Sequence, residues 1–79
     1  MIANALTRML RSPAEALDES LAAARRRLPI GRPAERMDGQ TGIVTAIETD
    51  GWQVFVTVEL PEGGAVRELC GFWTGRMSL

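Results

Sequence analysis

The chain has 79 residues, of which 46% are hydrophobic and 24% charged, a composition typical of globular rather than disordered proteins. At this length we expect a single small domain whose core supplies little net stability, so that a partner chain would help to stabilise it. The formal net charge of −1 argues against a generic binder of phosphate backbones, because such binding needs an excess of clustered cations.

The amino-terminal residues predict two helices in succession. Residues 2–11 place apolar side chains at helical spacing, at Ile2, Leu6, Met9 and Leu10. A second helix is expected to begin at Pro13, because Ser12 and Glu15 have the spacing of a capping box and proline is favoured at the first helical position. We expect neither a secretory signal nor a membrane span, because no apolar run approaches the roughly 20 residues that cross a bilayer.

The second helix is expected to run from Pro13 to about Leu28. Its apolar residues form one stripe with steps of three and four, namely Ala14, Leu17, Leu21, Ala24 and Leu28. Acidic residues occupy the first turns and Arg25, Arg26 and Arg27 the last, which complements the helix dipole. The arginine triplet therefore has two interpretations: a solvated helix end, or a basic patch that docks an acidic partner or a phosphate.

A connector and a β-hairpin follow. Prolines and glycines end the helix, so residues 30–41 are expected to form a connector that can contribute one short extended piece. Residues 42–60 match a hairpin in which Asp50-Gly51 supplies the tight turn. The face of the second arm expected to be buried consists of Trp52, Val54, Val56, Val58 and Leu60. The first arm alternates imperfectly, so either both of its faces are covered or a bulge shifts the alternation.

A third strand is predicted at residues 65–74, with Gly71 marking a bulge or a site of close packing. We expect Trp52 and one of Phe72 or Trp73 to fill the core beneath the helix, because aromatic rings contribute the largest buried area.

Phe55 lies on the opposite face of the hairpin from Trp52. In an open sheet its ring would be exposed, and an exposed apolar patch marks an interaction surface. We assign to this surface the residues Phe55, Phe72, Trp73 and Arg67. The alternative is that the sheet curls so that both faces are covered.

The residue types present argue against enzymatic chemistry. The chain has no histidine and one cysteine, Cys70, which removes the commonest general base, the usual nucleophile pairs and the usual zinc ligand sets. Cys70 is expected to be a small buried residue rather than a reactive thiol, and with no disulfide possible within the chain we expect a cytoplasmic protein. The carboxylates near the hairpin ends are Glu48, Asp50, Glu59 and Glu62. Asp50 has a structural explanation in the turn, and Glu48 and Glu59 lie at strand positions that are expected to face solvent. We therefore expect no enzyme activity, no metal site and no cofactor.

Four stretches carry a first family resemblance. They are the Ala-, Leu- and Arg-rich helix end at 22–28, the strand at 42–48, the Asp-Gly-Trp turn within 49–54 and the Val-Glu-Leu strand end within 57–60. Together they cover about half of the chain and resemble the gas-vesicle protein O family of small bacterial assembly proteins. The resemblance implies an accessory role in gas-vesicle formation, performed by binding other protein chains.

A second resemblance rests on Gly42-Ile43-Val44, with Ile47 three residues further on, followed by a hairpin turn and a Val-rich strand. This pattern is similar to the KOW-type SH3-like barrel of transcription and ribosomal factors. Such modules contact RNA or protein, so the resemblance implies a nucleic-acid or ribosome-associated binding module as the alternative.

The patterns together predict an α+β fold, with N-terminal amphipathic helices packed on a three-stranded antiparallel meander or on a small SH3-like partial barrel. Residues 1–29 would form the helical segment, 30–41 the connector and 42–79 the antiparallel β unit of a single domain. The expected function is that of a non-enzymatic, cytoplasmic accessory protein that binds a protein partner or further copies of itself. Nucleic-acid binding is the competing function.

Overall fold

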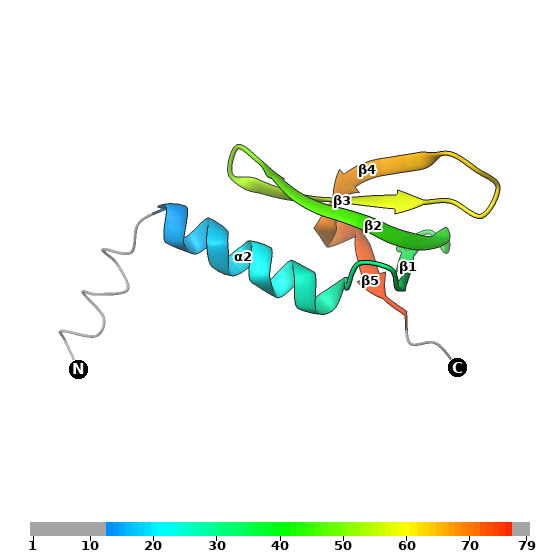
Figure 1. The fold of residues 1–79 in the computed structure, drawn as a ribbon, viewed down its shortest axis with the longest axis horizontal. Helices are drawn as coiled ribbons and strands as arrows, with labels where there is room; N and C mark the ends of the chain where they lie inside the picture. Colours follow the sequence, from blue (N-terminus) through cyan, green and yellow to red (C-terminus); the bar gives the residue numbers. More distant parts are fainter. Residues whose placement is uncertain (1–12, 77–79) are drawn as a thin grey trace.

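The computed structural model describes residues 13–76, which form one helix packed on a five-stranded antiparallel sheet (Figure 1). The helix is α2 (Pro13–Arg27), and a 3₁₀ turn, η1 (Cys70–Phe72), precedes the last strand. The strands are β1 (Pro33–Arg36), β2 (Thr41–Asp50), β3 (Gln53–Glu59), β4 (Ala65–Leu69) and β5 (Trp73–Gly75). The α+β class is therefore confirmed. The predicted helix over 2–11 and the Ser12 side of the capping box lie outside the described residues.

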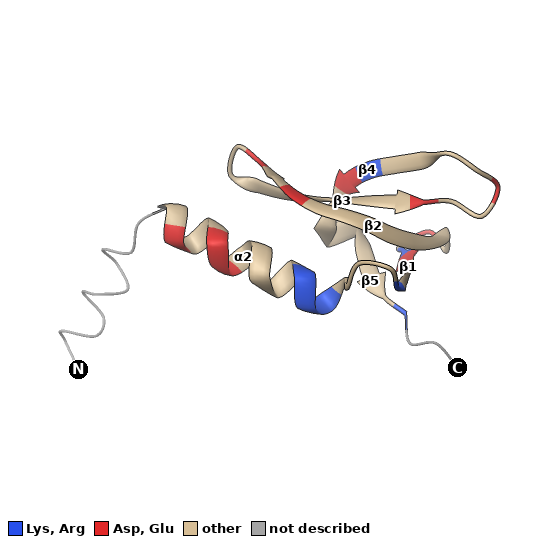
Figure 2. Cartoon of the chain, viewed as in Figure 1, with Lys and Arg blue, Asp and Glu red and all other residues tan. Residues whose placement is uncertain are grey.

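The second half of helix α2 has the buried face that its sequence predicts, whereas Ala14, at the start of the predicted stripe, is exposed. Ala24 and Leu28 are buried and Leu21 packs against the core, so the apolar stripe faces the sheet, where α2 contacts β2 and β3. The Leu28 amide donates to the Ala24 carbonyl oxygen at 2.7 Å, which prolongs the helical hydrogen bonding past Arg27. Figure 2 shows acidic residues in the first half of α2 and basic residues at its end, the order that complements the helix dipole.

The predicted hairpin is present as β2 and β3. Asp50 pairs with Gln53, which leaves a two-residue loop of Gly51 and Trp52. Gly51 has a φ of 63°, and no residue other than glycine has a positive φ among those described. A positive φ at the first loop position alone matches a type II′ turn, whose twist suits a hairpin. The turn glycine was therefore identified correctly, and the loop lies one residue further along than the Asp50-Gly51 turn predicted.

The prediction that Trp52 fills the core is wrong. Its side chain is 71% exposed, whereas Val56 and Val58 of the same predicted face are fully buried. The reason is the position of the loop. Trp52 occupies the second loop residue, beyond the last strand pair, so the alternation that buries the valines does not apply to it.

A β-bulge explains the imperfect alternation of the first arm. The pairing of β2 with β3 shifts register between Val44 and Ala46, and the Thr45 hydroxyl donates to the Thr57 carbonyl oxygen at 3.2 Å. The extra residue brings both Val44 and Ile47 to the core, although they differ in sequence parity. The bulge interpretation of the sequence is therefore confirmed.

The third predicted strand is in fact two strands on opposite edges of the sheet. β4 ends at Leu69, η1 leads the chain to the other edge of the sheet, and β5 pairs there with β1 rather than with β3. The strand order is β4-β3-β2-β1-β5, so the three-stranded meander is only part of an open five-stranded sheet. The short extended piece expected within the connector is β1, which joins the last strand to the hairpin. Sequence alternation missed this arrangement because a 3₁₀ turn of three residues interrupts it without a proline.

The core lies between α2 and the sheet and is small. Its fully buried side chains include one aromatic ring, that of Trp73, together with Leu28, Val44, Val56 and Val58. Cys70 is also buried, as predicted. The expectation that one of Phe72 and Trp73 would be in the core is therefore confirmed, and the residue is Trp73.

Candidate interaction surfaces

Phe55 and Arg67, two of the four residues assigned to an interaction surface, contact each other on the face of the sheet turned away from α2. The Arg67 guanidinium carbon lies 4.4 Å from the centroid of the Phe55 ring, a cation–π contact. Arg67 also forms a long ion pair, at 3.7 Å, with Asp50 across the hairpin end. The ring is half-buried, so Phe55 presents a surface shielded by an arginine rather than a bare apolar patch.

Trp73 does not contribute to an exposed surface, because its side chain is fully buried. The indole Nε1–H donates to the Glu68 Oε1 carboxylate oxygen at 3.0 Å, and the same oxygen accepts from Arg36 Nη1 at 2.9 Å. The Arg36 guanidinium carbon also lies 5.5 Å from the centroid of the Trp73 ring. Trp73 must therefore be removed from the predicted interaction surface, since its ring fills the core and its one donor is satisfied internally.

Arg36 is the centre of a charge network that continues to the surface. Its Nε and Nη2 donate to the two carboxylate oxygens of Asp38, at 2.9 and 3.0 Å, while Nη1 donates to Glu68. The hydrogen bond from Arg36 holds the pKa of Asp38 below its usual range, and the two carboxylates raise the pKa of Arg36. The network fixes the β1–β2 turn against β4.

Phe72 remains exposed and lies beside a residue that the sequence did not single out. The Met37 amide donates to the Phe72 carbonyl oxygen at 3.1 Å, and their side chains are 81% and 47% exposed. We call this pair the Met37–Phe72 patch. Met37 lies between Arg36 and Asp38, so charged residues flank this half of the patch along the chain. The sequence signal for Met37 was weak: a methionine between two charged residues, just ahead of a glycine turn.

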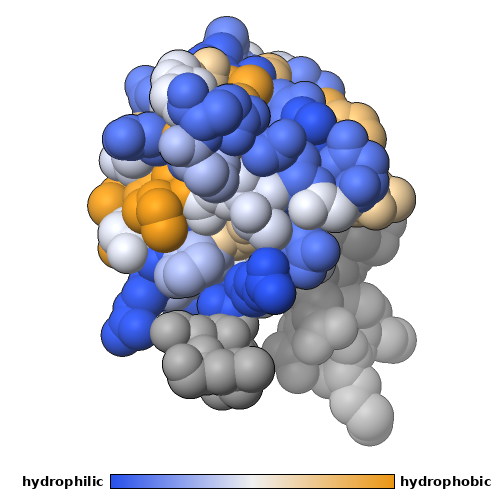
Figure 3. All heavy atoms as spheres, turned by 90° about the vertical axis from the view of Figure 1, so that its right-hand side faces the viewer, coloured by the Kyte–Doolittle hydropathy of each residue, from blue (hydrophilic) through white to orange (hydrophobic). Residues whose placement is uncertain are grey.

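Other exposed apolar side chains are Trp52 at the hairpin tip, and Ile30 and Ile43, which are 60% and 43% exposed. Ile30 and Ile43 belong to segments joined by a hydrogen bond of 2.7 Å from the Gly31 amide to the Val44 carbonyl oxygen. Figure 3 shows apolar residues gathered on one side of an otherwise mostly polar face.

The three arginines of the predicted basic patch have different surroundings in the structure. Arg27 donates from Nη1 to the Trp73 carbonyl oxygen and from Nη2 to the Cys70 carbonyl oxygen, the latter at 3.1 Å. Arg27 thus anchors the end of α2 to η1 and β5, whereas Arg25 and Arg26 form neither a side-chain hydrogen bond nor an ion pair among the described residues.

Two further arginines lie at the same end of the molecule. Arg76 follows β5, and its amide donates to the Pro33 carbonyl oxygen at 3.0 Å, directly after exposed Arg32 in the facing segment. We define the basic end as the exposed arginines Arg25, Arg26, Arg32 and Arg76 (Figure 2). Sequence reasoning found only its first two members, because the others are brought in by the pairing of β1 with β5.

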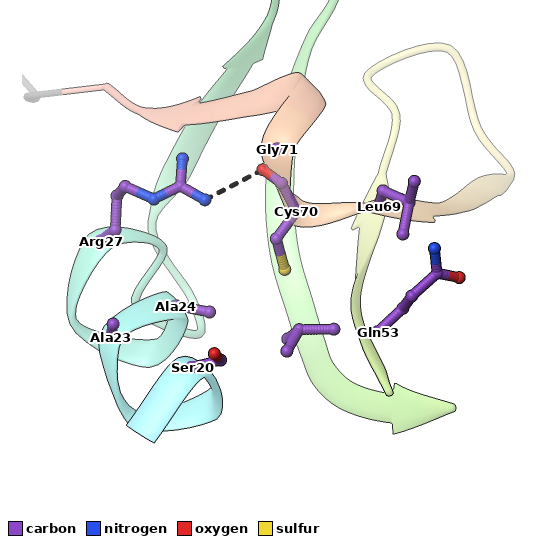
Figure 4. A pocket seen from close by; sticks show the side chains of 9 residues that line it. Ser20, Ala23, Ala24, Arg27, Gln53, Leu69, Cys70 and Gly71 are labelled. Carbon is purple, nitrogen blue, oxygen red and sulfur yellow. Dashed lines mark hydrogen bonds between the residues drawn. The ribbon is translucent and has the colours of Figure 1, made fainter. Parts of the chain in front are cut away.

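An open groove lies between α2 and the ends of β3 and β4, with a volume of about 450 Å³ (Figure 4). Its lining residues are Ser20, Ala23, Ala24, Arg27, Gln53, Val54, Leu69, Cys70 and Gly71. Burial raises the pKa of the Cys70 thiol, and the nearby charge of Arg27 opposes this rise. The thiol therefore stays protonated at neutral pH.

Among residues 13–76, no group of three or more Cys, Asp and Glu side chains is placed to hold a metal ion. The carboxylates considered from the sequence, at positions 48, 50, 59 and 62, are all exposed. No helix of this part of the chain is long and apolar enough to cross a bilayer. Comparisons of the chain with protein-family models, with curated proteins and with solved structures found no match.

Proposed function

We propose that this chain is a non-enzymatic accessory protein that acts by binding another protein chain or further copies of itself. The Met37–Phe72 patch is the observation that carries the proposal, because two large apolar residues whose backbones are joined by a hydrogen bond are both exposed, and burial against a partner would remove their apolar surface from water. Methionine and aromatic residues are enriched in binding interfaces.

The small core supports the same proposal. One tryptophan and a set of aliphatic and small side chains form the whole buried cluster of the described residues. A core of this size supplies only a narrow margin of stability, and burial of further apolar surface against a partner would add to it.

Variants of the patch test the proposal. We expect the natural chain to self-associate or to retain a protein partner at micromolar concentration, and Met37→Ser and Phe72→Ser to weaken that association. Ile30→Ser is the matched control, since Ile30 is also exposed but lies outside the patch. Sedimentation velocity and affinity capture followed by mass spectrometry provide the readout. A monomer that captures nothing, or patch variants that bind as well as the control, would contradict the proposal.

The specific setting that we propose is gas-vesicle assembly in the cytoplasm. It rests on the resemblance of the α2 end and of the Asp-Gly-Trp hairpin to the gas-vesicle protein O family. Capture with the tagged chain should then recover vesicle structural proteins, and recovery of an unrelated complex alone would remove this setting while leaving the binding function in place.

Nucleic-acid or ribosome-associated binding is the second candidate, favoured by the basic end, where four exposed arginines have no carboxylate partner among the described residues. The fold proposed with it is an SH3-like partial barrel. Side-chain contacts from Glu68 on β4 to Trp73 on β5 and Arg36 on β1 support it, because they draw opposite edges of the sheet together.

Filter binding to RNA at low and at moderate salt tests this second function. Tight binding with a steep salt dependence, reduced in Arg25→Gln and Arg76→Gln but not in Arg67→Gln, would favour it over protein binding. Weak binding that is the same for all three variants would exclude it.

A further inference from the structure

The groove beside α2 combines apolar walls with polar groups that have unused hydrogen-bonding capacity. Ala23 and Ala24 form one wall, and Leu69 and Cys70 contribute the opposite one (Figure 4). Val54 also lines the groove. The alanine side chains are short, which leaves space above the helix backbone for a larger side chain from another molecule. Mostly apolar grooves with a few convergent polar groups are the usual form of a binding site.

Arg27 places a positive charge in this groove. Its guanidinium has five N–H donors, and two of them are used for the carbonyl oxygens of Cys70 and Trp73. These acceptors are neutral, and Arg27 forms no ion pair with any carboxylate among residues 13–76. Its charge is therefore uncompensated, and donors remain for a carboxylate that enters the groove.

Two neutral polar groups lie beside this charge. Neither the Ser20 hydroxyl nor the Gln53 amide forms a side-chain hydrogen bond within the described part of the chain. Both line the groove and can orient a polar backbone or side chain of a ligand.

We propose that the groove binds a segment of a partner protein in which a carboxylate stands next to an apolar side chain. The apolar side chain would lie against Ala23 and Val54, and the carboxylate would accept hydrogen bonds from Arg27. A single cation suits one carboxylate rather than a polyanion, whose recognition needs several clustered cations. This inference rests on the proposed function, since it assigns a class of partner segment to a protein-binding chain.

Nuclear magnetic resonance of the full, ¹⁵N-labelled chain tests the inference with defined peptides. The probe is a capped Gly-Leu-Glu-Leu-Gly peptide, compared with versions that replace Glu by Gln or both Leu by Ser. We expect the first peptide to shift the amide signals of Ser20, Ala23, Gln53 and Gly71. The two altered peptides should bind roughly tenfold more weakly or worse, because one lacks the carboxylate that pairs with Arg27 and the other lacks the apolar side chains that fill the groove.

A pair of neighbouring alanines provides matched variants. Ala22 and Ala23 are both exposed on α2, but only Ala23 lines the groove. Ala23→Glu should abolish peptide binding by filling the groove and pairing with Arg27, whereas Ala22→Glu should leave it unchanged. Equal loss in both variants, or binding that ignores the Glu-to-Gln change in the peptide, would overturn the proposal.

Other occupants give different results, each of which would also overturn it. Concentration-dependent shifts of the same signals in the free protein would indicate a second copy, and nuclear Overhauser contacts from residues 1–12 would indicate the chain's own terminus. Shifts with decanoate but not with the peptide would indicate a lipid ligand. If Ala23→Glu retains the partner that Met37→Ser loses, the groove assignment fails while the proposed function stands.

Discussion

Arg25, Arg26 and Arg27 are identical in chemistry and adjacent in sequence, yet they have different roles. Arg27 donates to the main-chain carbonyl oxygens of Cys70 in η1 and Trp73 in β5, whereas the other two form no side-chain hydrogen bond among the described residues. The helix dipole explains why basic residues are favoured at this end. Only the angular position of each residue on the helix decides which of them reaches the sheet.

Arg27→Ala should therefore lower the free energy of unfolding by about 2 kcal/mol, because two carbonyl oxygens lose a charged donor. Arg26→Ala is the control and should change stability by less than about 0.5 kcal/mol, as is usual for an exposed site. Urea unfolding followed by tryptophan fluorescence measures both. Equal effects would show that the carbonyl contacts of Arg27 contribute nothing to stability.

The raised pKa of the Cys70 thiol is expected to make the free energy of unfolding vary with pH in the alkaline range. Burial raises the pKa of its thiol in the folded state, so above the ordinary thiol pKa of about 8.5 the unfolded state loses its proton first. The contribution of the protonated thiol to stability is fully present below that pH and is lost as pH rises toward the folded-state pKa. Because the chain has no Lys, Tyr or His, no other side chain titrates in this window.

We expect the melting temperature of the natural chain to fall as the pH rises above the ordinary thiol pKa of about 8.5, and Cys70→Ala to remove most of that slope. Thermal unfolding by circular dichroism across this range provides the measurement. A slope that persists unchanged in Cys70→Ala would assign the alkaline loss to another process.

At the scale of elements, the β2–β3 hairpin depends on one close approach. Gly42 is buried in β2, and a Cβ at this position would lie 2.6 Å from the Glu59 carbonyl oxygen, in addition to meeting the Val58 side chain. The glycine ahead of the Ile43-Val44 pair, read in the sequence as part of a KOW-like pattern, therefore has a packing explanation within this fold.

Gly42→Ala should destabilise the protein by about 1–3 kcal/mol, since the methyl group meets backbone rather than the free end of a side chain. Gly71→Ala is the control, because a Cβ there has no neighbour within 4 Å and the backbone does not need a positive φ. The two variants are compared by their midpoints of urea unfolding, provided that the dependence of the free energy on urea concentration is the same for both. A stable Gly42→Ala variant would mean that β2 and β3 shift apart without cost.

The hairpin also shows which residues an alternating pattern predicts correctly to be buried. Val56 and Val58 are buried as the pattern predicts, and the bulge at Thr45 was among the alternatives read from the first arm. Trp52 is exposed although it continues the same alternation, because alternation describes strands and Trp52 belongs to the turn. The same limit applies to an interaction surface built from apolar residues. Alternation in the sequence shows which side chains share a face of the sheet, but whether that face is buried depends on which other elements cover it.

For the whole molecule, the two edges of the sheet are linked by side chains instead of by strand pairing. Glu68 on β4 accepts hydrogen bonds from Trp73 on β5 and from Arg36 on β1. The buried indole has its donor satisfied by this one carboxylate, and the same carboxylate holds an arginine that also binds Asp38. The sheet is open in its hydrogen bonding, yet its ends are held together through Glu68.

Glu68→Ala should lower the free energy of unfolding by about 1–3 kcal/mol, because the Trp73 donor is left buried without an acceptor. Amide hydrogen exchange should accelerate in both β4 and β5. Glu48→Ala, at an exposed site on β2, is the control for loss of a strand carboxylate. Faster exchange confined to β4 would show that Glu68 does not connect the two edges.

The sequence by itself determined the elements whose signals are local. These are helix α2 with its buried stripe, the hairpin with its turn glycine, and the burial of Cys70, because periodicity and turn chemistry act over a few residues. It also indicated a chain without the usual catalytic residue sets, through the absence of histidine.

Tertiary structure alone decided what lies together across the chain. Pairing of β1 with β5 places Trp73 in the core, brings Arg76 to the basic end and joins Met37 to Phe72, residues that are 35 positions or more apart in the sequence. The physical reason is that the three-residue turn η1 carries the chain from one edge of the sheet to the other, so the last strand changes edge without a pattern that periodicity could reveal. Contacts of this kind depend on the path of the whole chain, and no local residue pattern encodes that path.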